Sequence, residues 1–260
     1  MKVSGTAIHS GLTSTVTLHR EEGPIRFRRG AGSVQAHVRN VTAAARATSL
    51  GANGVQVHMV EHLLAALAVR GFYSGVLIEV DNDELPILDG SAAPWLPAID
   101  ELGQPPAAPQ PLRLAGPIEV RLGEGVATLA PGPAILDCSI QFDHPAIGHQ
   151  RVVLERARWH ELLNARTFGM LSEWESLKSR GLALGASEEH AIVFGDVGPL
   201  RPLRHRDEPV RHKALDALGD LHLLARPLEA RLTIVRGSHA LHHETARQLM
   251  QLSAQEAGQA

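Results

Sequence analysis

The sequence predicts an α+β fold in which helices form layers on mixed sheets. Helical and strand patterns are mixed in both halves of the chain, without the regular βαβ alternation of a doubly wound sheet. The proline-rich stretch Gly103 to Pro111 is incompatible with a helix or a central strand, which indicates a connector. Hydrophobic residues make up 44% of the 260 residues and aromatic residues only 3%, so aliphatic side chains must fill the core. We therefore expect two parts, residues 1–104 and 112–260.

Three elements are predicted in the first part. Apolar residues recur at helical spacing from about Met59 to Val69, and Gly71 is placed to end that helix. The short aliphatic run Val76–Val80 is typical of a strand. A second helix is predicted over Ala93–Leu102, after the turn at Asp89-Gly90.

Five elements are predicted in the second part. Two aliphatic runs, Ala134–Phe142 and Arg231–Arg236, are interpreted as strands. Longer amphipathic patterns predict helices over Leu154–Ala165, Glu208–Ala225 and His239–Ala257. No repeat is visible at the level of individual residues.

Composition excludes several function classes. The net charge is −3 and the basic residues are scattered, so no basic stripe indicates nucleic acid as a partner. The single cysteine, Cys138, cannot form an internal disulfide, and the first residues lack the apolar core of a signal peptide. No window approaches the ~18 continuous apolar residues of a spanning helix. These features predict a cytoplasmic chain with no transmembrane segment and at most peripheral membrane contact.

The predicted helix 208–225 carries a candidate metal site. At 3.6 residues per turn, His212, Asp216 and Asp220 lie along one face, with Lys213 at its edge. An imidazole and a carboxylate one turn apart can share a Zn²⁺ ion, and a second carboxylate can orient a neighbouring group. A solvated helix face with a His–Asp pair is the simpler alternative. The lysine favours the site, because it is one of only three in the chain.

The stretch His58-Met-Val-Glu61-His62 supports three interpretations. It matches H-x-x-E-H, the inverted zinc-peptidase motif, in which both histidines bind the metal and the glutamate is the base. Alternatively, only His62 binds metal and Glu61 takes a proton from the metal-bound water. A short pattern of this kind also arises by chance on an ordinary amphipathic helix.

Two further segments carry residue types that are useful in catalysis. Arg166-Thr-Phe-Gly169 places a hydroxyl between a charge and an aromatic ring, and Gly237-Ser-His239 presents an imidazole at a predicted helix start. Either segment could also be purely structural, since a histidine near a helix start is usually exposed or hydrogen-bonded.

Together these segments resemble a known family, the zinc-dependent UDP-3-O-acyl-N-acetylglucosamine deacetylases of lipid A biosynthesis. The similar blocks occur in the family's order over nearly the whole chain, and the 12-residue block beginning at Val210 is highly specific. The opening GTAIHSG around His9 is also similar to the family's. The block at Val210 is VRHKALDALGDL, and the others are VEHLLAAL, ELPILDGSAAPW, DHPAIGHQ, ARTFG, SRGLALG and SHAL.

The resemblance implies a fold and a metal site. The family has two α+β domains of similar topology, packed helix face to helix face with the active site between them. By resemblance, the metal ligands are His62, His212 and Asp216. Three protein ligands leave a coordination position open for water, as a catalytic zinc ion requires.

The resemblance also assigns catalytic roles. Glu61 is implied as the general base and His239 as the general acid, with Asp220 orienting His239. Thr167 is implied in oxyanion contact and Lys213 in substrate contact. Zinc, base and acid together would hydrolyse an N-acetyl group to acetate and a free amine.

Substrate-binding residues follow from the same resemblance. Phe168 and a hairpin-like insert within about residues 166–187 would line a passage for the acyl chain, whereas Phe142 and Arg236 would lie near the nucleotide. Trp174 stands where the family more often has a smaller aliphatic residue. An inward indole would narrow the passage, and an outward one would be a surface aromatic.

These expectations define one function and its competitors. We expect a monomer that removes the N-acetyl group from UDP-3-O-((R)-3-hydroxyacyl)-N-acetylglucosamine. His58 departs from the family, which usually has a small hydroxylated residue there, so a divergent paralogue acting on a related amide is an alternative. The others are an inverted-motif zinc peptidase and a non-catalytic module that binds a nucleotide sugar or lipid.

Overall fold

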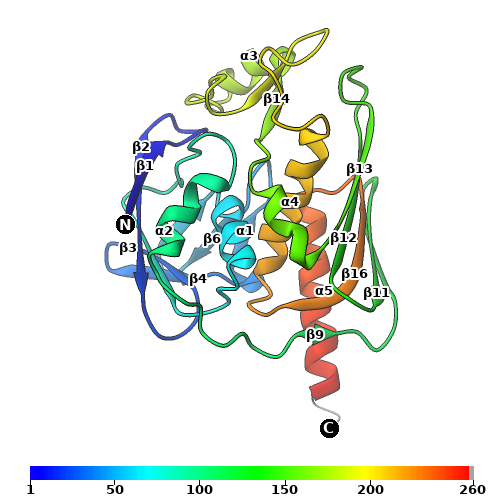
Figure 1. Ribbon diagram of the computed structural model, residues 1–260. Helices are drawn as coiled ribbons and strands as arrows, with labels where there is room; N and C mark the ends of the chain where they lie inside the picture. The colour runs from blue at the N-terminus through cyan, green and yellow to red at the C-terminus, as the bar shows by residue number, and fades with distance from the viewer. Residues whose placement is uncertain (258–260) are drawn as a thin grey trace.

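A computed structural model describes residues 1–257, with side chains through residue 255. It confirms the α+β class, because two large sheets and several helices pack around a shared aliphatic core. Figure 1 shows one sheet at each side of the molecule with helices between them. Residues 258–260 of the second expected part lie outside this description.

The first large sheet belongs entirely to the expected first part. Its order is β1-β2-β8-β3-β4, and every neighbouring pair is antiparallel except β3 and β8, which are parallel. The strands are β1 (Lys2–Thr6), β2 (Thr13–Arg20), β3 (Arg26–Arg29), β4 (Gly32–Gln35) and β8 (Val76–Val80). A smaller antiparallel sheet beside it contains β5 (Val41–Ala43), β6 (Ser49–Ala52) and β7 (Val55–His58).

The second large sheet has the same strand order and the same directions. Its order is β10-β11-β16-β12-β13, again with one parallel pair, β12 and β16, among antiparallel ones. The strands are β10 (Ile118–Leu122), β11 (Gly125–Pro131), β12 (Ile135–Gln141), β13 (His149–Glu155) and β16 (Leu228–Val235). The short β9 (Leu112–Arg113) adds to β16, directly after the connector.

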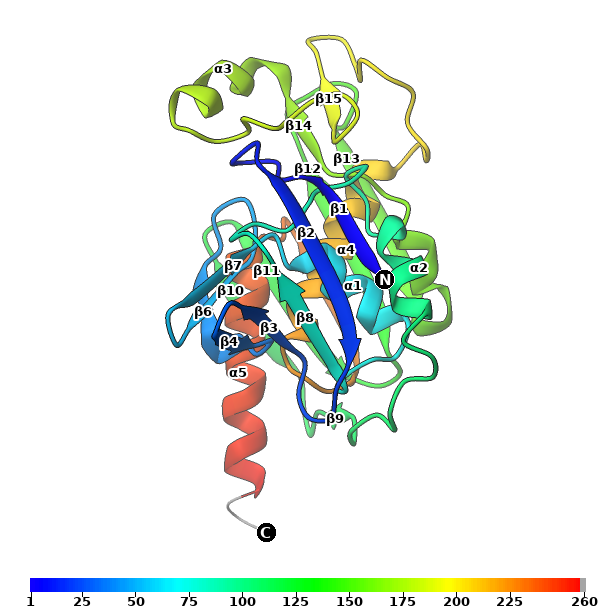
Figure 2. The ribbon, with the colours of Figure 1, turned by 90° about the vertical axis from the view of Figure 1, so that its left-hand side faces the viewer.

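The helices occupy equivalent places in the two halves. One helix precedes each parallel central strand, α1 before β8 and α4 before β16, and these two helices pack against each other (Figure 2). The helices are α1 (Glu61–Val69), α2 (Leu96–Asp100), α3 (Leu171–Ser179), α4 (Glu208–His222) and α5 (His239–Ala257), with 3-10 turns η1 (Val38–Asn40), η2 (Ala93–Trp95) and η3 (Arg156–Leu162).

Helix α1 is buried on all sides, because a sheet covers one face and α4 the other. Its residues 61 through 68 are all buried, which explains why its sequence is apolar around most of its circumference. The contact with α4 is close at Gly219, where an added Cβ would overlap the backbone carbonyl of Glu61. Glycine therefore allows the two backbones to approach.

Two predicted elements are wrong. The helix expected over Leu154–Ala165 is instead the end of β13 followed by η3, because Val152 and Leu154 are buried in strand alternation between exposed neighbours. The insert is not hairpin-like: β14 (Phe168–Met170) and β15 (Ile192–Phe194) are parallel, and α3 lies in the connection between them. A parallel pair requires such a long crossover.

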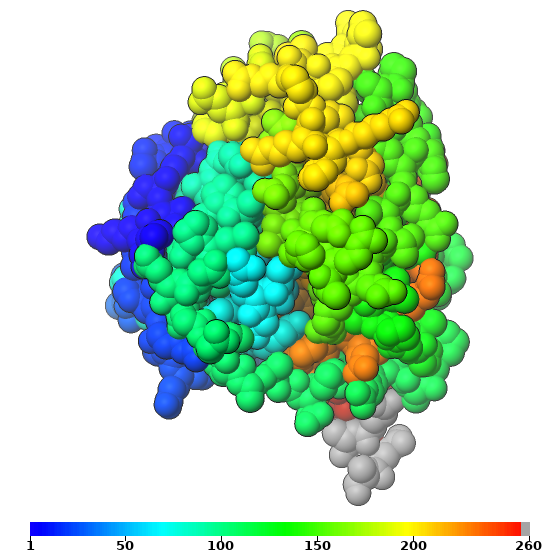
Figure 3. Space-filling model, in the orientation of Figure 1, coloured from blue at the N-terminus to red at the C-terminus, as the bar shows by residue number. Residues whose placement is uncertain are grey.

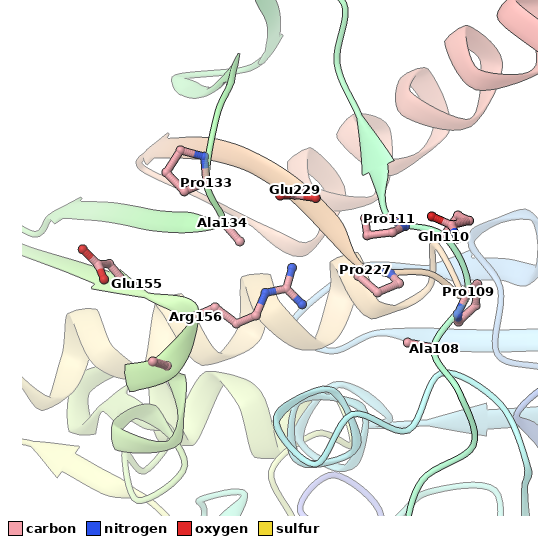
Figure 4. A pocket seen from close by; sticks show the side chains of 11 residues that line it. Ala108, Pro109, Gln110, Pro111, Pro133, Ala134, Glu155, Arg156, Pro227 and Glu229 are labelled. Atoms are coloured by element: carbon pink, nitrogen blue, oxygen red, sulfur yellow. The ribbon is translucent and has the colours of Figure 1, made fainter.

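The connector 103–111 has no regular structure, as its prolines predict. With Pro227, Glu229 and Arg156 it lines a surface pocket of about 580 Å³ beyond the C-terminal end of α4 (Figure 4). None of the predicted site residues lines that pocket. Within residues 1–257, no helix combines the length and the apolar character needed to cross a bilayer.

The close helix contact gives a stability prediction. Gly219→Ala should lower the free energy of unfolding by about 1–3 kcal/mol, the usual cost of overpacking. At an open helix position the same change would stabilise by about 1 kcal/mol, so the sign is diagnostic. Urea denaturation measures the difference. Gly116→Ala is the control, because an added Cβ there meets no atom within 4 Å; a Gly219 variant as stable as wild type would contradict the close contact.

Candidate active site

Helices α1 and α4 bring together a group that could hold a metal ion. His62 lies in the first turn of α1, and His212 and Asp216 lie one turn apart on α4. The ligand atoms of these three residues all lie within 4.8 Å of one another. Asp216 Oδ1 is 3.3 Å from His212 Nε2 and 3.8 Å from His62 Nε2. The three residues predicted as ligands are therefore adjacent in space.

The hydrogen bonding and protonation of these three side chains favour cation binding. Asp216 Oδ1 is buried and has no hydrogen-bond partner among the described residues, which leaves its lone pairs available. His212 Nδ1 donates to the carbonyl of Ala165 at 3.1 Å, so its Nε2 is left as the ligand atom. Burial, reinforced by the nearby His212, lowers the pKa of His62 to about 3 and keeps that imidazole neutral. Two neutral imidazoles and one carboxylate are a donor set that zinc accepts.

Glu61 begins α1 beside this group. Its carboxylate is buried, and Oε2 accepts a hydrogen bond from the backbone N–H of Thr48 at 3.0 Å. Burial raises the pKa of Glu61 to about 7, with Asp220 and Asp216 adding to the rise and His239 opposing it. A carboxylate with a pKa near neutrality is suited to general-base work.

His239 begins α5 and faces the same space. Its Nδ1 lies 2.7 Å from Asp220 Oδ2, and its Nε2 lies 4.0 Å from Asp216 Oδ2. Burial alone would lower the pKa of His239, but the Asp220 carboxylate outweighs it and raises that pKa to about 9. A cationic imidazole beside a metal group can donate a proton.

Lys213 lies at the edge of this group, as the helix spacing predicts. Its Nζ donates to Asp216 Oδ2 at 3.0 Å and lies 5.8 Å from the centre of the Phe168 ring. Burial would lower the pKa of Lys213, but the Asp216 carboxylate raises it. The side chain therefore stays cationic.

An ion pair between Arg166 and Glu208 holds the segment that carries Thr167 against α4. Glu208, the first residue of α4, is fully buried and accepts hydrogen bonds from the Arg166 backbone and guanidinium and from the backbone of Arg204. This holds the ARTFG segment against α4, where Ala165 also accepts the His212 hydrogen bond. Sequence reasoning named Arg166 as a charge but did not find its partner.

A cavity of about 130 Å³ extends from Thr167 and Phe168 toward α3. Its lining is mostly apolar and includes Trp174, so the structure favours the inward placement of the indole. Trp174 Nε1 is buried without a hydrogen-bond partner in the described chain, and Lys178 Nζ lies 4.8 Å from the ring centre. Figure 3 shows the insert over the upper end of the molecule, where Leu184 N donates to His9 O.

A second cavity, of about 350 Å³, lies beside Lys213. Phe142 and Arg236 line it, as does Lys213 itself. The Phe142 ring lies 5.4 Å from that of Phe168, which lines the first cavity, so this aromatic pair stands between the two cavities. Arg236 Nη1 is paired with Glu124 Oε2 at 2.6 Å.

Sequence reasoning missed three buried neighbours of Asp220. Thr48 Oγ1, His242 Nδ1 and His243 Nε2 all contact its carboxylate, the imidazoles at 2.8 and 3.3 Å. His239, His242 and His243 are spaced i, i+3, i+4, which places them on one face of α5. That spacing was a usable signal, whereas Thr48 belongs to no pattern.

His58 does not belong to the metal group. It ends strand β7, whereas His62 is on α1, and Met59 between them has a φ of 62°. Its Nδ1 lies 2.7 Å from Ser49 Oγ. The inverted-peptidase interpretation is therefore wrong, because H-x-x-E-H requires both histidines on one helix.

Comparison with known proteins is consistent with this geometry. A UDP-3-O-acyl-N-acetylglucosamine deacetylase of Wolinella succinogenes is 36% identical over 262 residues, covering 96% of this chain and 88% of the relative. Proteins of the same name from Myxococcus xanthus and Thermosynechococcus vestitus are 39% and 40% identical, each covering 95% of this chain and 83% and 90% of their own lengths.

The family-level match covers almost the same span. Residues 1–251 match the model described as LpxC: UDP-3-O-acyl N-acetylglycosamine deacetylase. That span contains both large sheets, the metal group, Glu61 and His239. The chain therefore belongs to the UDP-3-O-acyl N-acetylglycosamine deacetylase family.

Proposed function

We propose that this protein is a zinc-dependent hydrolase that removes the N-acetyl group from UDP-3-O-((R)-3-hydroxyacyl)-N-acetylglucosamine in lipid A biosynthesis. The products are acetate and the free 2-amino sugar nucleotide. One observation carries the proposal: a buried set of metal-binding atoms lies directly beside a carboxylate and a cationic imidazole. A module that only bound the substrate would not need these three together.

The residues divide the chemistry of amide hydrolysis. His62, His212 and Asp216 would hold zinc, which when bound supplies Lewis-acid activation of water and of the amide carbonyl. Glu61 takes the proton from the attacking water. The Thr167 hydroxyl donates to the developing oxyanion, which it can stabilise because Arg166 and Glu208 fix its segment in advance.

The second half of the reaction needs a proton on the departing nitrogen. His239 supplies it from Nε2, which faces Asp216, while Nδ1 stays bonded to Asp220. Asp220 thereby fixes the orientation of the ring and stabilises its cationic form. Lys213 contributes a positive charge where substrate enters between the two cavities.

The two cavities match the two ends of the substrate. The mostly apolar cavity with Phe168 and Trp174 takes the acyl chain, and the cavity with Phe142 and Arg236 takes the nucleotide. Two domains, residues 1–104 and 112–260, packed through α1 and α4, would place the site at their junction.

We further propose that the protein is a cytoplasmic monomer. A paralogue acting on a related amide would keep the metal group and differ in these cavities.

Substitution of single histidines tests which residues bind the metal. His62→Ala and His212→Ala should each lose bound zinc and acetate release, because each removes one of three ligands. His58→Ala should keep zinc, since that residue lies outside the group. Elemental analysis after dialysis, together with acetate release from the UDP-sugar, measures both. Zinc loss in the His58 variant alone would refute the assignment.

The pH profile tests base and acid together. With a pKa of about 7 for Glu61 and about 9 for His239, kcat/KM should rise as Glu61 loses its proton and fall as His239 loses its own. Glu61→Gln and His239→Ala should each lower kcat by roughly 10²-fold or more with zinc retained. His19→Ala, at an exposed histidine of β2, is the control. Near-normal turnover in either site variant would remove that residue from its role.

Trp174 tests the acyl passage. Because a close-packed wall cannot absorb an indole without excluding other atoms, Trp174→Ile should raise kcat/KM for long-chain over short-chain substrate by about tenfold. Both enzymes would be assayed over a series of acyl lengths. Superimposable chain-length profiles would show that Trp174 does not limit the passage.

A further inference from the structure

The Asp220 carboxylate is held by four side chains from two distant parts of the chain. Three are imidazoles of α5: His239 and His242, whose Nδ1 atoms contact Oδ2 at 2.7 and 2.8 Å, and His243, whose Nε2 is 3.3 Å from Oδ1. The fourth is the hydroxyl of Thr48, hydrogen-bonded to Oδ1. All five residues are buried, so water cannot replace a lost partner freely.

The direction of these bonds can be assigned. Neighbouring imidazoles hold the pKa of Asp220 well below its usual range despite burial, so this carboxylate only accepts. The Thr48 hydroxyl must therefore donate to Asp220, and its oxygen is left to accept from His243 Nε2–H at 3.0 Å. His243 Nδ1 has no hydrogen-bond partner within the described residues, so Nε2 is the ring nitrogen through which this side chain donates.

Thr48 also contacts the base. Its backbone N–H donates to Glu61 Oε2 at 3.0 Å, while its hydroxyl donates to Asp220. It lies just before β6, in the half of the chain that carries α1, whereas Asp220 and His239 belong to α4 and α5. One residue thus links the carboxylate that takes the first proton to the pair that gives the second.

We infer that Thr48 is a positioning residue that fixes the Asp220–His239 pair relative to Glu61. This inference rests on the proposed function. Displacing the His239 imidazole should lower kcat and leave KM nearly unchanged. His239 acts on the departing nitrogen, whereas substrate affinity depends mainly on the two ends of the substrate.

Three substitutions separate the hydroxyl from side-chain size. Thr48→Val keeps the shape and the backbone N–H but removes the hydroxyl, and Thr48→Ala and Thr48→Ser form a smaller pair that differs only in the hydroxyl. We expect Val and Ala to lower kcat by roughly 10- to 100-fold with KM within about threefold, as for a misplaced catalytic group. Thr48→Ser should restore most of kcat. Zinc content should be unchanged in all three.

Thr245→Val is the matched control. Thr245 is fully buried, and its hydroxyl donates only to the carbonyl of Leu241 within α5, so its loss should leave kcat unchanged. An equal loss of kcat in this control, or equal kcat in the Ala and Ser variants, would overturn the positioning role.

A measurement on the wild-type enzyme tests the inference even if the Thr48 variants fail to fold. Nitrogen-15 NMR of the imidazoles should show His243 protonated at Nε2, with that proton close to the Thr48 methyl group. A His243 ring that carries a proton at Nδ1 and none at Nε2 would overturn the inference. If the wild type released no acetate, the proposed function would fail, whereas activity with an unaffected Thr48→Val would reject only the inference.

Discussion

The site depends on the close crossing of α1 and α4. Gly219 on α4 lies against the Glu61 backbone, where a side chain would push the helices apart. Because Glu61 and His62 are consecutive on α1, and His212, Asp216 and Asp220 are spaced by one turn on α4, a single crossing brings all five together. The metal group and Glu61, the proposed general base, are thus positioned by the same helix contact.

The two buried carboxylates on α4 explain why polar side chains gather where α1 and α4 cross. Asp216 and Asp220 are both buried carboxylates, which is costly unless each is paired and hydrogen-bonded. Asp220 meets this need completely, with hydrogen bonds from Thr48, His239 and His242 and a further imidazole, that of His243, 3.3 Å away. Asp216 meets it only in part, since Lys213 bonds Oδ2 while Oδ1 has no hydrogen bond within the described residues. Two similar carboxylates one turn apart therefore differ: both oxygens of Asp220 accept hydrogen bonds, whereas one oxygen of Asp216 accepts none from the described residues.

The sequence predicted what periodicity alone determines. Helical spacing placed His212, Asp216 and Asp220 on one face, and α5 begins and ends where its pattern predicts. It failed at Leu154, where alternation within β13 resembles a helical face over a few residues. The equal strand order of the two sheets was expected only from the family resemblance, because the two halves share no repeat at the level of individual residues. Thr48 could not be found, since it is 172 positions from Asp220 and only the fold brings them together.

The placement of the cavities shows how such a site can select its substrate. On the proposed function the amide lies at the metal group, and the acetyl group itself offers few atoms for recognition. The cavity with Trp174 and the cavity with Arg236 lie on different sides of the Phe168 and Phe142 rings. A molecule that fills both cavities has its centre held beside Lys213, so contacts far from the amide can position it. A substrate with only one end could bind to one cavity, but it would not be held in place at Glu61 and His239. On the proposed function, specificity follows from occupying both cavities at once, and the Phe168–Phe142 pair between them sets the distance that a substrate spans.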